Sequence, residues 1–137
     1  MVELLLGATG GAGLVTIPIA SVTKDTPPML QSQGFTHPIA AVRVRNVGRL
    51  RVRITAWSLT TTKGGISLSP ISLSIGPPLP HWLEAGDTEL WAADLAAVHA
   101  LMHTTASVLK IPLERMGVRA TVDLGSGRTV KARGTIR

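Results

Sequence analysis

The sequence of 137 residues contains no cysteine and little aromatic surface. The lack of cysteine excludes disulfides, thiolate chemistry and zinc–sulfur sites, and it fits a reducing cytoplasm. Aromatic residues make up 3% of the chain, with three Trp, one Phe and no Tyr, whereas apolar residues reach 45%. The core must therefore be built mainly from Val, Ile, Leu and Ala, and this length suffices for a single domain with a real core.

Basic residues are absent from 64–109, although the whole chain has a formal charge of +6. That central stretch carries four acidic residues, Glu84, Asp87, Glu89 and Asp94, whereas the segments on either side of it are each strongly basic. This change of charge sign along the chain, from basic to acidic and back to basic, suits packing of identical subunits or contact with an acidic partner. A solvated basic face is the plainer interpretation.

Long hydrophobic runs are also missing, since no stretch approaches the ~20 apolar residues of a spanning helix. Residues 1–22 contain Glu3, four glycines and Pro18 and lack the basic n-region of a signal peptide. We expect neither a signal peptide nor a membrane anchor.

Alternation of apolar and polar residues is clearest in 39–54. Val42 and Val44 alternate with arginines, the segment 46–49 is predicted to turn, and alternation then resumes to Ile54. The phase shifts near Trp57, which predicts a β-bulge.

The remaining pattern predicts an all-β sandwich of about seven strands with one short crossover helix before the last hairpin. We divide this single domain into 1–36, a Gly-rich arm with a first strand and a loop, and 37–137, the sandwich body. The expected elements are a strand at 14–22, a loop at 23–36, an edge strand at 66–75 interrupted by Pro70, a Pro-rich loop at 76–86, a strand at 88–93, a helix capped by Asp94 and ended by Pro112 at the latest, and a hairpin from 118 to 136.

Three segments, 42–59, 79–95 and 118–132, resemble immunoglobulin-like domains of actinobacterial and actinobacteriophage proteins. The shared features are the Asn-x-Gly turn, the Leu-x-x-Gly-Asp turn and a hairpin with Gly-Arg at its tip. The resemblance implies an Ig-like sandwich without enzymatic activity. It further implies a virion subunit assembled in the host cytoplasm, serving as capsid decoration, connector or tail accessory, with protein partners. The chain lacks the cysteine pair and tyrosine corner of antibody domains.

The glycine-rich segment 7–13 is similar to a dinucleotide-binding loop. Such a loop needs a helix directly after its glycines, but Leu-Val-Thr-Ile-Pro follows here. We therefore expect no cofactor, and we interpret Gly10, Gly11 and Gly13 as part of a flexible arm that packs closely against another backbone.

Candidate catalytic and metal-binding groups are weak. His99 and His103 are four residues apart on the expected helix, but Ala100 stands where metalloproteases place Glu. The acidic residues of the central stretch match no calcium loop. We expect no metal site and no enzymatic activity.

Five arginines are the main interaction candidates: Arg43, Arg45, Arg49, Arg51 and Arg53. If their two strands form a hairpin, four of them share one outward patch; if 46–49 is a corner between sheets, the patch is split. A patch would bind an acidic protein surface or nucleic acid, or else serve solubility. Trp82, in the Pro-rich loop, is a candidate interface anchor. A basic nucleic-acid-binding barrel of OB type is the alternative to an assembly subunit.

Overall fold

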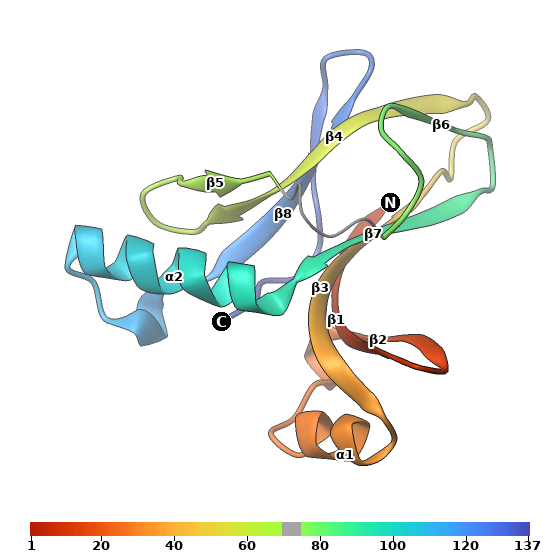
Figure 1. Ribbon diagram of the computed structural model, residues 1–137. Helices are drawn as coiled ribbons and strands as arrows, with labels where there is room; N and C mark the ends of the chain where they lie inside the picture. Colours follow the sequence, from red (N-terminus) through yellow and green to blue (C-terminus); the bar gives the residue numbers. More distant parts are fainter. Residues whose placement is uncertain (70–74) are drawn as a thin grey trace.

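The apolar strands build two antiparallel sheets that pack face to face (Figure 1). The computed structural model describes residues 1–69 and 75–137. The first sheet, sheet A, has the strand order β2 (Gly13–Pro18), β1 (Val2–Gly10), β3 (Phe35–Arg45) and β7 (Thr88–Asp94).

Sheet B is built around the long strand β4. Its order is β5 (Ser67–Leu68), β4 (Val52–Thr61), β8 (Val118–Leu124) and β9 (Thr129–Lys131), and β6 (His81–Leu83) pairs with the beginning of β4. The β4–β8 register shifts between Ile54 and Ala56. The predicted bulge is thus confirmed, and it lies just before Trp57.

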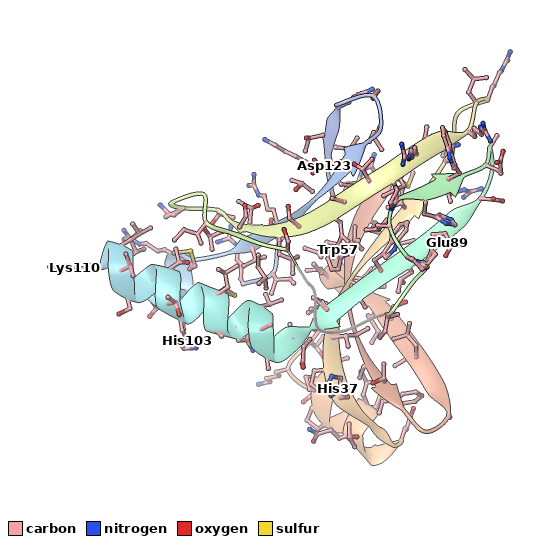
Figure 2. All side chains as sticks on the ribbon, turned by 45° about the horizontal axis from the view of Figure 1, so that its top comes forward. His37, Trp57, Glu89, His103, Lys110 and Asp123 are labelled. Atoms are coloured by element: carbon pink, nitrogen blue, oxygen red, sulfur yellow. The ribbon has the colours of Figure 1, made fainter. Side chains whose placement is uncertain are left out.

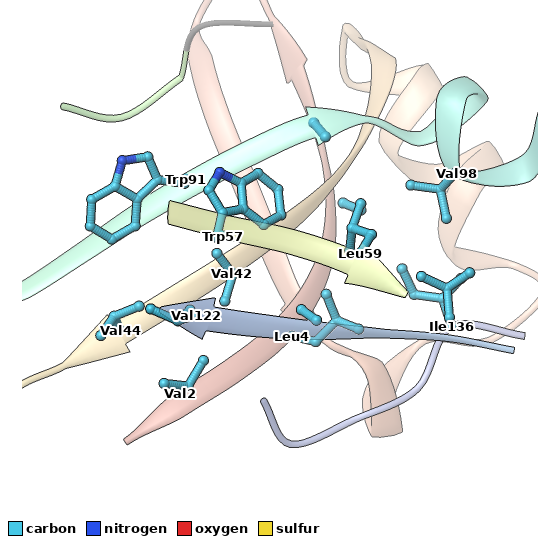
Figure 3. Close-up of a cluster of buried hydrophobic side chains, with 14 of the residues drawn as sticks. Val2, Leu4, Val42, Val44, Trp57, Leu59, Trp91, Val98, Val122 and Ile136 are labelled. Atoms are coloured by element: carbon cyan, nitrogen blue, oxygen red, sulfur yellow. The ribbon is translucent and has the colours of Figure 1, made fainter. Parts of the chain in front are cut away.

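The core lies between the sheets and draws on both (Figure 3). Sheet A contributes Leu4, Val42 and Trp91, and sheet B contributes Leu59 and Val122, all buried. Because side chains alternate across a strand, each sheet turns one apolar face inward. The predicted all-β sandwich is confirmed at this level. The expectation of about seven strands was too low, since the described residues form nine strands and two α-helices.

The N-terminal segment is a central part of sheet A and differs from the expected arm. The sequence predicts a flexible Gly-rich arm here, but β1 pairs with β2 on one side and with β3 on the other. Leu4 enters the main core, whereas Leu5 joins a second cluster with Ile39 on the opposite face of the sheet. A strand buried on both faces has a continuous apolar sequence, which alternation alone does not reveal.

The expected loop at 23–36 contains a short helix, α1 (Thr26–Ser32). Its prolines stand in the first turn, where the missing N–H has no helical partner to lose. The expected strand at 14–22 is shorter than predicted, because a 3-10 turn, η1 (Ile19–Ser21), follows β2.

The crossover helix before the last hairpin is confirmed as α2 (Leu95–Leu109), and a 3-10 turn, η2 (Leu113–Arg115), follows it. The helix buries Val98, Met102, Thr105 and Ala106. Asp94 occupies the N-cap position as expected, but its side chain makes no capping hydrogen bond. Lys110 ends the helix in a left-handed conformation, φ 55°, before Pro112.

The structure describes part of the segment 66–75, in which serine alternates with apolar residues. Its start forms β5, which pairs with β4 at the edge of sheet B, as expected of an edge strand. Pro70 and the rest of 70–74 lie outside the described residues. In the part of the chain that the structure describes, no helix is long and apolar enough to cross a membrane.

Candidate functional site

The loop 46–51 connects sheet A to sheet B, so it is a corner and the arginines are split between two sheets. Arg43 and Arg45 lie at the end of β3 in sheet A. Arg43 Nη2 donates to Glu3 Oε2 at 2.6 Å, which binds this guanidinium within the chain. The single patch of four arginines expected for a hairpin does not form.

At the start of sheet B, Arg51 and Arg53 lie beside the exposed Trp82, whereas Arg49 stays exposed in the loop before β4. The register of β4 and β6 places Arg53 opposite Trp82, so the two side chains share the outward face. Arg51 Cζ lies 4.2 Å from the centroid of the Trp82 ring, within cation–π distance. Trp82 remains 48% exposed. Trp82, which was expected in a Pro-rich loop, lies in strand β6, and only the pairing of β6 with β4 reveals that it is a neighbour of Arg53.

A groove of about 300 Å³ opens beside this pair. It is lined by Arg51, Val52, Arg53 and Trp82 and by the turn residues Leu124, Gly125 and Ser126, and we call it the basic groove. Gly125 donates its N–H to the carbonyl oxygen of Arg53 at 2.8 Å, which fixes the turn against β4. The groove thus combines guanidinium groups with an aromatic ring in one concavity.

The outward face of sheet B continues from the basic groove as a polar surface. By register, Ser58 lies opposite Thr121, Thr60 opposite Arg119, and Thr121 opposite Lys131. The hydroxyls of Ser58 and Thr121 are 2.9 Å apart. The cations Arg119 and Lys131 and a row of hydroxyls therefore extend this face away from the groove. Asp123, whose Oδ1 accepts from Thr129 at 2.8 Å, is an acidic residue on the same strand as Arg119.

A second feature is the end of the sandwich formed by residues 46–51 and 84–87, which we call the loop end. Asn46 is buried, and its Nδ2 donates to the carbonyl oxygens of Leu50 at 2.8 Å and Leu83 at 3.0 Å. Its Oδ1 accepts from Gly48 N at 3.0 Å. The loop so held presents Val47, 69% exposed, and Leu50, 81% exposed. The turn predicted at 46–49 uses no positive φ at Asn46 or Gly48, because Asn46 fixes it through its side chain.

The glycine-rich segment is a tight hairpin turn between two strands. Gly10 pairs with Gly13 across the two-residue turn Gly11–Ala12, and β2 follows directly. The prediction that a strand follows these glycines is confirmed. A Cβ at Gly10 would collide with the backbone carbonyl of Gly34, so the close approach predicted for this segment occurs within the chain.

Titratable side chains are scattered over the molecule. His37 Nε2 lies 3.5 Å from Asp94 Oδ1, and His81 Nε2 lies 3.9 Å from Glu89 Oε1. His103 lies on α2, at the opposite end of the molecule from Glu89 and β6 (Figure 2). Among residues 1–69 and 75–137, no three His, Asp or Glu side chains come close enough to hold a metal ion.

An apolar cavity of about 280 Å³ lies on the side of the molecule where the β1–β2 hairpin meets α1. Leu6, Ile17, Leu30 and Phe35 line it, and His99 reaches it from α2. The cavity offers apolar contact with few polar groups to orient a reacting ligand.

Comparisons with protein-family models, with curated proteins and with solved structures found no match to this chain. Its function must therefore be argued from the two surfaces above. One is the loop end, with exposed apolar side chains on a braced loop. The other is the basic groove, which continues into the polar face of sheet B.

Proposed function

We propose that this chain is a non-enzymatic interaction subunit of a larger assembly, with an immunoglobulin-like sandwich as its rigid body. The observation that carries the proposal is the loop end. Val47 and Leu50 are strongly exposed, yet a buried asparagine fixes the loop that bears them. An exposed apolar patch on a preorganised element is typical of a binding surface.

The energetics favour a protein partner at this end. Complete burial of each exposed aliphatic side chain contributes about 1.5–3 kcal/mol. Asn46 N donates to the carbonyl oxygen of Asp87, and the carbonyl oxygen of Asn46 accepts from Gly86 N. The acidic turn 84–87 therefore lies beside the basic loop that carries Arg49. Both charge signs on one patch allow two copies to dock with opposite charges facing, as a two-fold contact requires. We therefore take a second copy of this chain as the partner.

Sedimentation velocity over a range of protein concentrations tests this contact. We expect the wild type to associate as its concentration rises, and the double variant Val47→Ser/Leu50→Ser to stay monomeric at the same concentrations. The matched control is Val108→Ser, because Val108 is equally exposed but lies on α2 at the opposite end. A wild type that is monomeric throughout, or a control that dissociates like the double variant, contradicts the proposal.

We place this assembly in a bacteriophage virion, as the resemblance of 42–59, 79–95 and 118–132 to actinobacteriophage domains implies. The genes beside the one that encodes this chain provide the test. Capsid, portal or tail genes as neighbours support a virion subunit, whereas neighbours that encode metabolic enzymes contradict it.

A further inference from the structure

The basic groove gathers the two chemistries that a nucleotide requires. Arg53 lies on the outward face beside Trp82, and Arg51 stacks on the tryptophan ring. Guanidinium groups bind phosphate oxygens through their fork of N–H donors, and an exposed aromatic ring stacks on a base. Neither chemistry alone distinguishes nucleic acid from other anions, but their combination in one groove does.

We propose that the basic groove and the outward face of sheet B bind single-stranded nucleic acid. A base stacks on the exposed part of the Trp82 ring at the groove, and Arg53 contacts the adjoining phosphate. The basic groove shares Arg51 with the loop end, but binding there relies on Trp82 and Arg53 and does not depend on the loop-end contact.

The length of the face suits an extended strand. Arg119 lies opposite Thr60, and Thr60 is seven residues beyond Arg53 on β4. At about 3.3 Å per residue, the two guanidinium-bearing positions are about 23 Å apart along the strand. Serine and threonine hydroxyls occupy the positions between them, where they can donate to phosphates, and Lys131 lies on the adjacent strand. This span fits the lower end of the range of about 4–16 nucleotides occupied on small β-barrel modules.

The groove favours a single strand over a duplex. A single unpaired base fits the concavity between Trp82 and the turn 124–126, whereas the bases of a duplex are stacked inside it. Gly125 helps to keep the groove open, because a Cβ at this position would lie 3.1 Å from Arg53 Cβ and crowd the arginine side chain.

Binding of fluorescein-labelled dT12 to the full chain, followed by anisotropy from low to high salt, is the primary experiment. With four cations on the face, Arg51, Arg53, Arg119 and Lys131, we expect log K to fall against log salt with a slope of up to about −2.8. Tryptophan fluorescence supplies a second readout with unlabelled dT12. Because Trp57 and Trp91 are buried, quenching reports stacking on Trp82.

Two variants separate charge from stacking. Arg53→Ser should flatten the salt slope by about 0.7, the contribution of one phosphate contact to a single strand. Trp82→Leu should weaken binding about 10-fold while the slope stays unchanged, since stacking releases no counterions. Arg115→Ser, which removes the same charge from η2, is the matched control and should leave affinity within about 2-fold. Circular dichroism confirms that each variant is folded.

Heparin and duplex DNA are the competing ligands. The proposal predicts that neither quenches tryptophan fluorescence and that dT12 binds more tightly than the duplex. It is overturned if dT12 fails to bind at low salt, if heparin alone binds, if the duplex binds equally well, or if Arg115→Ser weakens dT12 binding as much as Arg53→Ser. The Val47→Ser/Leu50→Ser variant should retain dT12 binding, which keeps this result independent of the association test.

Discussion

At the scale of single residues, contacts distant in sequence define both candidate surfaces. The sequence predicts the alternating strand pattern of 39–54 and indicates Trp82 as an interaction candidate. The pairing of Arg43 with Glu3, and the position of Arg51 over Trp82, were not. Each joins residues on different strands, and side-chain spacing along one strand carries no information about the neighbouring strand.

Asn46 gives the sharpest prediction at this scale. Asn46→Ala removes two donors from the carbonyl oxygens of Leu50 and Leu83 and leaves Gly48 N without its acceptor. Because unsatisfied buried polar groups are costly, we expect the free energy of unfolding to fall by about 1–3 kcal/mol in urea denaturation. Thr60→Ala, which removes an exposed hydroxyl contact to Ser67, is the control and should cost under about 0.5 kcal/mol. Equal losses in both variants would show that Asn46 does not brace the loop.

At the scale of secondary-structure elements, the sequence predicted the bulged strand β4, the helix α2 and the start of the last hairpin, whose turn contains Gly125 and Gly127. These elements have strong local patterns: alternation, helical spacing and paired glycines. It did not predict β1 or α1. The apolar run of β1 lacks alternation because both faces are buried, and α1 lies in the segment expected to be a loop, with its prolines in the first helical turn.

The β1–β2 hairpin provides a prediction for an element, because two adjacent glycines have opposite surroundings. A Cβ at Gly10 would collide with the backbone of Gly34, whereas one at Gly11 would meet no atom within 4 Å. We expect Gly10→Ala to lower the free energy of unfolding by about 1–3 kcal/mol, as overpacking does, and Gly11→Ala to change it by less than about 0.5 kcal/mol. Thermal and urea unfolding of the two variants give the comparison. Equal stability of the two would restore the interpretation of residues 1–13 as a loose arm.

At the scale of the whole molecule, the C-terminal tail joins the two sheets. Arg133 exchanges backbone hydrogen bonds with β1 of sheet A, donating to Val2 O at 3.0 Å and accepting from Leu4 N at 2.8 Å. Three residues later, Ile136 exchanges a pair of 2.8 Å bonds with Val118 of sheet B. The sequence suggested one final strand over this region, but β9 ends at Lys131 and the rest crosses between the sheets. Pairing across two sheets leaves no periodic trace in a short segment.

Ile136 lies where this tail enters the shared core, so its truncation should weaken both sheets together. We expect Ile136→Ala to lower the free energy of unfolding by about 2–5 kcal/mol, the cost of a buried aliphatic cavity. Ile66→Ala is the control, because Ile66 is exposed and outside the core cluster.

Hydrogen exchange of backbone amides in the Ile136→Ala variant then distinguishes two mechanisms. If the tail couples the sheets, amides of β3 and β8 lose protection by the same factor, because both exchange through one global unfolding. A loss confined to β8 would mean that the sheets unfold separately, and the loop end, which bridges them through Asn46 and Leu83, would then open with the weaker one.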